Sequence, residues 1–264
     1  MIAKPCAPVL SLAVPPGPAP SLVSSRVLGL YAVGGIASAA VATLLVVRGP
    51  IWLAAFAAWG AASLNFLASL YAGAAAGRDT ATRLRQGPWT AAYGVALLPY
   101  RWLQFCWIVV RRAQAREPAM QDVGGGIVLG GRAFPWDRAL FESLRIGAVV
   151  DLCAEIPEAP FVRAAVGERY HAAPALDGSA PIDDAFDRAV VQAAGWAREG
   201  HRVLVHCALG HGRSVLIAAA ALVALGEHPD VGAAVEALRA LRPAVNLHGA
   251  QRAALDRWAA RRTG

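Results

Sequence analysis

The sequence has few cysteines, and they lack the spacing of a metal site or a disulfide framework. Its 264 residues include four, at positions 6, 106, 153 and 207, and no two of them form a Cys-x-x-Cys pair. This spread argues against both a zinc site and a set of structural disulfides. It fits a reducing compartment, where a free thiol persists. We therefore expect no metal and no cofactor.

The C-terminal half lacks net charge. The formal net charge of the chain is +7, and residues 1–125 account for all of it, with ten basic residues against three acidic ones. Residues 126–264 carry fifteen arginines and fifteen acidic residues. A nucleic-acid-binding domain places its basic excess on the folded surface, so no nucleic-acid partner is expected. The basic excess indicates membrane topology instead.

Two long runs without a charged residue lie in the N-terminal half. Residues 28–47 and 51–76 are each long enough to cross a bilayer, and Gly49 and Pro50 break the chain between them. The first run is too long, and begins too late, for a cleaved signal peptide. The pattern predicts a transmembrane hairpin, with Tyr71 near the membrane interface, where aromatic side chains are enriched.

A third apolar stretch, residues 90–110, predicts an interfacial helix over about 90–112 rather than a third span. Arg101 and Gln104 lie near its middle, and a central arginine costs about 2.5–3.5 kcal/mol on insertion scales. Pro99 also interrupts a continuous helix. The aromatic and basic side chains around it suit a helix that lies in the interface.

The basic residues of this half predict an orientation. With two spans, all of them except Arg48 lie on one side, which the positive-inside rule places in the cytoplasm. We expect a multi-pass protein of the inner or plasma membrane with a cytoplasmic C-terminal domain. The expected regions are a disordered, proline-rich leader over 1–25, a membrane region over 26–122 and a folded domain over 123–264.

The folded domain alternates strands and helices. Gly124 to Gly126 is interpreted as the hinge into it. Strands are predicted at 127–130, 148–153, 170–176 and 202–206, and helices at 136–144, 183–199, 214–225, 231–241 and 250–261. This alternation predicts an α/β fold, with helices on both faces of a sheet.

The loop between the last predicted strand and the next helix has the composition of a phosphate site. Cys207 ends the strand, and Arg213 follows just before the helix. Gly210 and Gly212 let successive N–H groups converge on one anion, and the helix N-terminus adds partial positive charge. Arg213 offers a planar fork for two phosphate oxygens. A thiol in this setting has a pKa of roughly 3.5–7.5 instead of about 8.5, so Cys207 would attack phosphorus as a thiolate and form a phosphocysteine.

The residues from His206 to Ser214 read His-Cys-Ala-Leu-Gly-His-Gly-Arg-Ser, which resembles the HCxxGxxRS signature of the cysteine-based protein tyrosine and dual-specificity phosphatases. The resemblance implies that Cys207 is the nucleophile, that Arg213 binds the phosphate, and that Ser214 helps the thiolate leave. His206 would orient the loop, although a lone histidine there would also suit the core. The residues that would surround the phosphate are His206, Ala208, Leu209, Gly210, His211, Gly212 and Arg213.

The resemblance also implies a general acid and a fold. Dual-specificity members carry an aspartate about thirty residues before the cysteine, and Asp177 has this place. Asp183 and Asp184 compete with it, although both suit the start of a helix. Asp151, at a strand end, is interpreted as structural. The family's fold is a central mixed sheet flanked by helices, here preceded by a membrane hairpin in a bacterial-type arrangement.

Two further segments resemble parts of the family. The run from Arg242 to Asn246, with Gln251, resembles a segment that follows the signature and would brace the loop. The run from Leu152 to Glu155 resembles a strand end of the lipid-phosphatase branch, whose cysteine forms a protective disulfide with the nucleophile. For Cys153, simple core packing is the preferred interpretation.

The sequence leaves the substrate open among phosphate monoesters. The loop has no lysine, which disfavours polyphosphorylated inositol lipids. We expect a membrane-anchored protein tyrosine or dual-specificity phosphatase acting on a phosphoprotein. The alternative is a phospholipid substrate, a lipid monophosphate such as phosphatidylglycerophosphate. A catalytically dead phosphate-binding module is the third interpretation.

Overall fold

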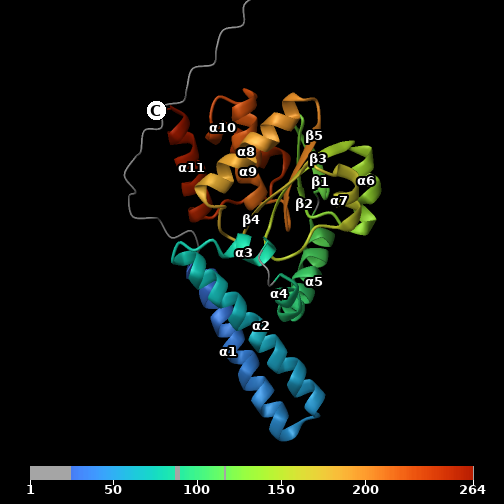
Figure 1. Ribbon diagram of the computed structural model, residues 1–264, viewed down its shortest axis with the longest axis vertical. Coiled ribbons are helices and arrows are strands. Elements are labelled where there is room, and N and C mark those ends of the chain that lie inside the picture. The colour runs from blue at the N-terminus through green and yellow to red at the C-terminus, as the bar shows by residue number, and fades with distance from the viewer. Residues whose placement is uncertain (1–24, 87–89, 116, 264) are drawn as a thin grey trace, which may run out of the picture.

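The computed structural model describes residues 25–86, 90–115 and 117–263, as an α/β domain from which two long helices extend (Figure 1). The predicted leader, apart from Ser25, lies outside the described residues. Shorter helices fill the junction between the two parts (Figure 1).

The two long helices are α1, Ser25–Arg48, and α2, Ile51–Ala75. Both are long and apolar enough to cross a membrane, and they pack side by side as a hairpin (Figure 1). At Gly35 of α1, an added Cβ would lie 2.7 Å from Asn65 of α2, so the helices approach closely there. Large apolar side chains point outward along both helices, among them Leu30, Val33, Ile36, Leu44, Ile51, Trp52 and Phe56. The predicted helix pair is confirmed.

The stretch predicted as one interfacial helix is divided. It forms two helices, α4 over Thr90–Ala96 and α5 over Leu98–Gln114. A further short helix, α3, precedes this stretch at Thr80–Gln86. The break falls at Leu97, and Pro99 stands in the first turn of α5, where its missing N–H costs no hydrogen bond. The Arg101 side chain turns to the domain, where its Nε donates to the carbonyl oxygen of Glu155 at 2.8 Å.

Five strands form one sheet in the described residues, in the order β1-β2-β5-β3-β4. Their bounds are β1 Met120–Gly124, β2 Ile127–Gly131, β3 Ile146–Cys153, β4 Tyr170–Ala175 and β5 Arg202–Cys207. Only β1 pairs in an antiparallel direction, with β2, and the other pairs are parallel. The sheet is therefore mixed, and the predicted fold class is confirmed.

The glycine run is a turn within the sheet and not the predicted hinge. Gly124, Gly125 and Gly126 connect β1 to β2 with φ angles of 93°, 56° and 76°. Glycine adopts this left-handed region without the steric cost that a Cβ brings. Strand β1 was not predicted from the sequence, because this short edge strand is partly exposed and has no apolar run.

Helices cover both faces of the sheet (Figure 1). One face carries η1 Pro135–Asp137, α6 Arg138–Ser143 and α7 Pro160–Val166. The other carries α8 Asp183–Arg198, α9 Arg213–Leu225, α10 Val231–Leu241 and α11 Gly249–Thr263. Helix α9 is buried along most of its length at the centre of the main core. This burial holds the N-terminus of α9 directly after the Cys207 loop.

A separate apolar cluster joins the helical half to the domain. It includes Leu67 and Tyr71 of α2, together with Ala154 and Leu176 from loops of the domain. Tyr71 was predicted near a membrane interface, but its side chain is 0% exposed. The reason is that the C-terminal part of α2 packs against the domain, so the ring is covered by protein.

Candidate active site

Glu155, Asp177 and Cys207 lie at or just after the ends of three parallel strands. After β3 the chain leads to Glu155, after β4 to Asp177, and β5 ends at Cys207. Carboxyl ends of neighbouring parallel strands meet at one edge of a sheet, which is where α/β proteins place their sites. This edge faces the hairpin and α5 (Figure 1).

The loop after β5 holds the Cys207 thiol among donors. The Gly210 N–H donates to its Sγ at 3.3 Å, and the Ser214 Oγ lies 3.4 Å from it. Burial opposes ionisation of the thiol, but the Arg213 guanidinium and these hydrogen bonds outweigh it, so the pKa of Cys207 is lowered. Gly210 has φ 88°, and a Cβ there would lie 2.6 Å from the backbone of Gly130. Only glycine lets the loop close in this way.

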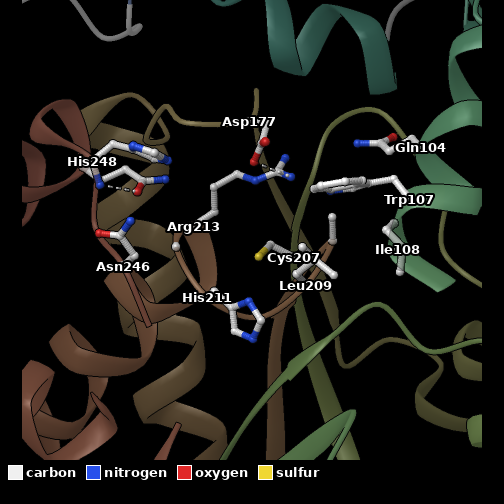
Figure 2. Close-up of a pocket in the computed structure, with 13 residues that line it drawn as sticks. Gln104, Trp107, Ile108, Asp177, Cys207, Leu209, His211, Arg213, Asn246 and His248 are labelled. Atoms are coloured by element: carbon white, nitrogen blue, oxygen red, sulfur yellow. Dashed lines mark hydrogen bonds and ion pairs between the residues drawn. The ribbon is translucent and has the colours of Figure 1, made fainter. Parts of the chain in front are cut away.

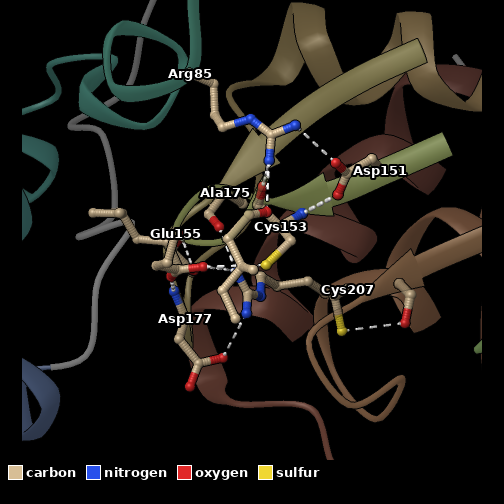
Figure 3. A network of polar contacts seen from close by, with 12 residues as sticks. Arg85, Asp151, Cys153, Glu155, Ala175, Asp177 and Cys207 are labelled. Carbon is tan, nitrogen blue, oxygen red and sulfur yellow. Dashed lines mark hydrogen bonds and ion pairs between the residues drawn. The ribbon is translucent and has the colours of Figure 1, made fainter. Parts of the chain in front are cut away.

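Arg213 is hydrogen-bonded through Nη1 of its guanidinium but not through Nε or Nη2 within the described residues. Its side chain is 1% exposed, and Nη1 donates to Glu155 Oε2 at 2.8 Å and to the Ala175 carbonyl oxygen at 2.6 Å (Figure 3). Its Nε and Nη2 are buried without a hydrogen-bond partner among the described residues. Buried donors of this kind need an acceptor, so Arg213 offers two N–H groups to an anion in the pocket that it lines.

Asp177 lies beside this guanidinium. Its Oδ1 is 3.3 Å from Arg213 Nη2, and its side chain is 62% exposed at the pocket (Figures 2 and 3). Of its two competitors, Asp183 pairs with Arg257 and Arg261 in the first turn of α8, and neither lines the pocket. Among the three predicted aspartates, geometry brings only Asp177 to Cys207.

A cavity of ≈ 180 Å³ opens over these groups (Figure 2). Its floor is the Cys207 loop, with Arg213 and Asp177 at one side. One other wall comes from α5, which contributes Gln104, Trp107 and Ile108. Another is formed by Asn246 and His248, which precede α11, and by Gln251 in its first turn. The predicted loop residues from Ala208 to Arg213 line it, except Gly210, which turns toward Gly130, and His206 lies buried beneath the loop. The contribution of α5 to the cavity was not predicted from the sequence.

Residues 135–260 match the family model of the dual specificity phosphatase catalytic domain. This part of the chain is a dual-specificity phosphatase domain. The match confirms the resemblance to this family that the sequence indicated. No curated protein matches the chain.

Solved structures of the family share the fold of this phosphatase domain. A mutant form of Tk-PTP has a TM-score of 0.50 and 22% identity, with 55% of this chain and 97% of that chain covered. Human DUSP28 has a TM-score of 0.50 and 15% identity, with 57% and 99% covered. PTPMT1 in complex with PI(5)P has a TM-score of 0.49 and 18% identity, with 55% and 97% covered. The two structures with a TM-score of 0.50 show that the fold is shared, and at these identities they show nothing about function.

Beneath the loop of the phosphatase domain lies a buried charged network. His206 Nε2 is 2.6 Å from Glu158 Oε2 and 3.8 Å from Asp151 Oδ1, and Arg85 of α3 pairs with Asp151 at 2.9 Å. Burial opposes protonation of the imidazole, but the two carboxylates outweigh it and raise the pKa of His206 to about 9. Asp151 therefore has the structural role that the sequence indicated.

Three residues of this network are close enough together to hold a metal ion, but their carboxylates already have cationic side chains as partners. Asp151, Glu158 and His206 place ligand atoms within 4.8 Å of one another. The protonated His206 and the Arg85 guanidinium balance the two carboxylates, so the charges of the group sum to zero without an ion. Tyr170 also donates its hydroxyl to Asp151 at 2.6 Å. The donor set fits an ion-pair network better than a metal site.

The segment that was predicted to brace the loop contacts it at one point. The Asn246 N–H donates to the His211 carbonyl oxygen at 2.9 Å. Gln251 Nε2 donates instead to the Ser179 carbonyl oxygen at 3.1 Å, and the buried Arg242 donates to the carbonyl oxygen of Pro118 at 3.0 Å. A bracing role for this segment stays a prediction.

Cys153 is a buried free thiol behind the site. Its Sγ lies 3.6 Å from Glu155 Oε2, and burial raises the pKa of this thiol. It packs in a cluster with Ile108, Phe134 and Ala208. These contacts are those of a core side chain.

Proposed function

We propose that the protein is a membrane-anchored phosphomonoester hydrolase with Cys207 as nucleophile, Arg213 as phosphate ligand and Asp177 as general acid. The observation that carries this proposal is that all three line one cavity. The pKa of the Cys207 thiol is lowered, and Nε and Nη2 of Arg213 are buried without a hydrogen bond among the described residues. The membership of residues 135–260 in the phosphatase family supports the same chemistry.

In the first step the Cys207 thiolate attacks phosphorus, and a sulfur–phosphorus bond forms as the phosphorus–oxygen bond to the leaving group breaks. Asp177 gives its proton to the departing oxygen, which leaves as an alcohol. Arg213, through Nε and Nη2, and the loop N–H groups bind the phosphoryl oxygens as charge moves onto them. The products are the free alcohol and a phosphocysteine.

In the second step water hydrolyses the phosphocysteine. Asp177, now a carboxylate, takes a proton from the attacking water, and the sulfur–phosphorus bond breaks to release inorganic phosphate. Ser214, whose Oγ lies 3.4 Å from the sulfur, donates a hydrogen bond to the departing thiolate. The enzyme returns to its starting protonation state.

The hairpin supports a membrane location. Helices α1 and α2 have the length and composition of spanning helices, and their apolar side chains point outward. Trp102, Leu103 and Trp107 of α5 are also exposed, and Trp107 lines the cavity. With the basic residues of the N-terminal half on one side, the phosphatase domain would lie in the cytoplasm. A reporter fused after Gly264 should then give a cytoplasmic signal.

The position of the cavity favours a lipid monophosphate as substrate. One cavity wall is α5, which exposes apolar side chains, and the cavity opens at the edge of the sheet that faces the hairpin (Figure 1). With the hairpin in a bilayer, this edge of the sheet would face the membrane surface, where the phosphate groups of lipids lie. The second candidate, a phosphoprotein, was favoured by the sequence and is supported by the family match.

A substrate panel on the full-length protein in nanodiscs tests the proposal. Phosphate release is measured from phosphatidylglycerophosphate in the same bilayer and from soluble phosphotyrosine and phosphothreonine peptides, with Cys207→Ser as the blank. Faster turnover of the lipid supports the first candidate, and faster turnover of a peptide supports the second. Binding of phosphopeptide without turnover of any ester would contradict catalysis and identify a phosphate-binding module.

A further inference from the structure

The backbone of Asp177 is held from both sides. Its N–H donates to Glu155 Oε1 at 2.9 Å, and its carbonyl oxygen accepts a hydrogen bond from the Tyr71 hydroxyl at 3.2 Å. Tyr71 belongs to α2, 106 residues earlier in the chain, and lies outside the region that matches the phosphatase family. A helix of the apolar hairpin thus contacts the catalytic loop directly.

We propose that Tyr71 is a positioning residue that holds Asp177 at the cavity for proton transfer, so that the hairpin is part of the catalytic apparatus. The inference rests on the proposed role of Asp177 as general acid. Tyr71 does not touch the substrate site, since it does not line the cavity. It acts through the backbone of the loop.

Tyr71 is itself firmly placed. Its ring is 0% exposed and lies 5.2 Å, between centroids, from the ring of Tyr31 on α1. The apolar cluster around it contains Leu67 of α2 and Leu176, the residue before Asp177. A buried hydroxyl is costly to leave unpaired, so the packing of the ring and the hydrogen bond of its oxygen support each other.

The Asp177 loop depends on such anchors. The Asp177 side chain is 62% exposed, so packing contributes little to its position. The next residue, Gly178, has a φ of 73°, in the left-handed region that favours glycine. Glu155, which binds the Asp177 N–H through one oxygen, binds Arg213 through the other (Figure 3). Tyr71, Asp177, Glu155 and Arg213 therefore form one connected chain from the hairpin to the phosphate ligand. Small displacements of a catalytic group reduce rates strongly.

The proposal predicts a defect in proton transfer without a defect in phosphate binding. Tyr71→Phe keeps the ring and removes the hydroxyl, so the loop loses one anchor. The loss in kcat/KM should be larger for phenyl phosphate than for p-nitrophenyl phosphate, because the more basic leaving oxygen depends more on the acid. Inhibition by inorganic phosphate should be unchanged.

The experiment uses the full-length protein in nanodiscs, with Tyr31→Phe as the matched control. Tyr31 lies in the same aromatic cluster, but its hydroxyl pairs with that of Tyr100 at 3.2 Å. For Tyr71→Phe we expect a loss of about 2- to 10-fold with phenyl phosphate, the range that one hydrogen bond typically supports. We expect a loss of less than about 2-fold with p-nitrophenyl phosphate. An equal loss with both esters, or an equal loss in Tyr31→Phe, would overturn the proposal.

A double-mutant comparison separates this inference from the proposed function. If Tyr71 acts through Asp177, then Tyr71→Phe should cause no further loss in an Asp177→Asn background. An undiminished loss in that background overturns the positioning role. An Asp177→Asn protein with wild-type kcat/KM on phenyl phosphate overturns the acid assignment instead.

Hydrogen exchange provides a second measurement that does not depend on turnover. Peptides covering residues 173–180 should exchange faster in Tyr71→Phe than in Tyr31→Phe, while peptides from the Cys207 loop should be unchanged. A uniform increase over the whole domain would indicate a general loss of folding and would contradict a local role for the hydroxyl.

Discussion

The Arg213 guanidinium and the Glu155 carboxylate form a buried ion pair at 2.8 Å directly behind the cavity. The pair turns Nη1 away from the cavity. Among the described residues, Nε and Nη2 make no hydrogen bond, and Nη2 lies 3.3 Å from Asp177 Oδ1. In the proposed mechanism, Arg213 is therefore oriented before any substrate arrives, which avoids a reorganisation cost during the reaction.

Glu155→Gln should destabilise the domain. The change leaves the charge of Arg213 buried without its counter-ion, and breaking a buried pair costs about 3–5 kcal/mol. Chemical denaturation of the full-length protein, followed by tryptophan fluorescence, measures the change. The control is Glu236→Gln, whose pair with Arg239 is exposed and should contribute less than about 1 kcal/mol. Equal effects of the two changes would contradict the role of Glu155.

Asp177→Asn should lower kcat for phenyl phosphate by about 10²–10⁴-fold, the usual contribution of a general acid. Steady-state kinetics with this ester measure the loss. Asp183→Asn is the control, since Asp183 pairs with arginines of α11 away from the cavity. If Asp183→Asn caused the loss instead, our assignment would be wrong.

The lowered pKa of Cys207 predicts fast alkylation at neutral pH. Arg213 and the hydrogen bonds from Ser214 and Gly210 outweigh burial and favour the thiolate. The rate of reaction with iodoacetate, followed by mass spectrometry against pH, should have its midpoint below the usual thiol value of about 8.5. Ser214→Ala should move the midpoint upward. Cys153, whose pKa is raised by burial, should remain unmodified as an internal control.

The raised pKa of His206 predicts that the folded protein loses stability at alkaline pH. This pKa is raised to about 9 by Glu158 and Asp151 against the effect of burial. A raised folded-state pKa gives stabilisation that is complete below the ordinary value of about 6.5 and is lost as the pH rises through 9. The Tm should therefore fall from pH 6.5 to above 9.

This measurement is best made in a Cys207→Ser background. The lowered pKa of the thiol contributes in the opposite direction, because it adds stability as the pH rises toward the ordinary thiol value. Glu158→Gln removes the largest favourable partner of His206 and should flatten the alkaline decline. A decline of unchanged size in Glu158→Gln would show that His206 is not its source.

Local sequence was sufficient to predict the position of the Cys207 loop and most of the helices and strands of the domain. The residues from Cys207 to Ser214 are adjacent in the chain, so a strand, two glycines and a helix start place them together whatever surrounds them. Helix α10 was predicted with its observed bounds, because its apolar positions repeat at helical spacing. The strand β1 and the turn at Gly124 to Gly126 were missed because a short edge strand has little apolar pattern.

Only the tertiary structure decided what surrounds that loop. Glu155 comes from another strand end, Tyr71 from the hairpin and Trp107 from α5, and no spacing in the sequence relates them to Cys207. The sequence by itself was enough to predict a thiolate, a phosphate-binding arginine and a candidate acid, since their expected chemistry follows from residue type and local backbone. How that acid and arginine are held depends on contacts between segments up to 106 residues apart, which form only when the hairpin packs on the domain.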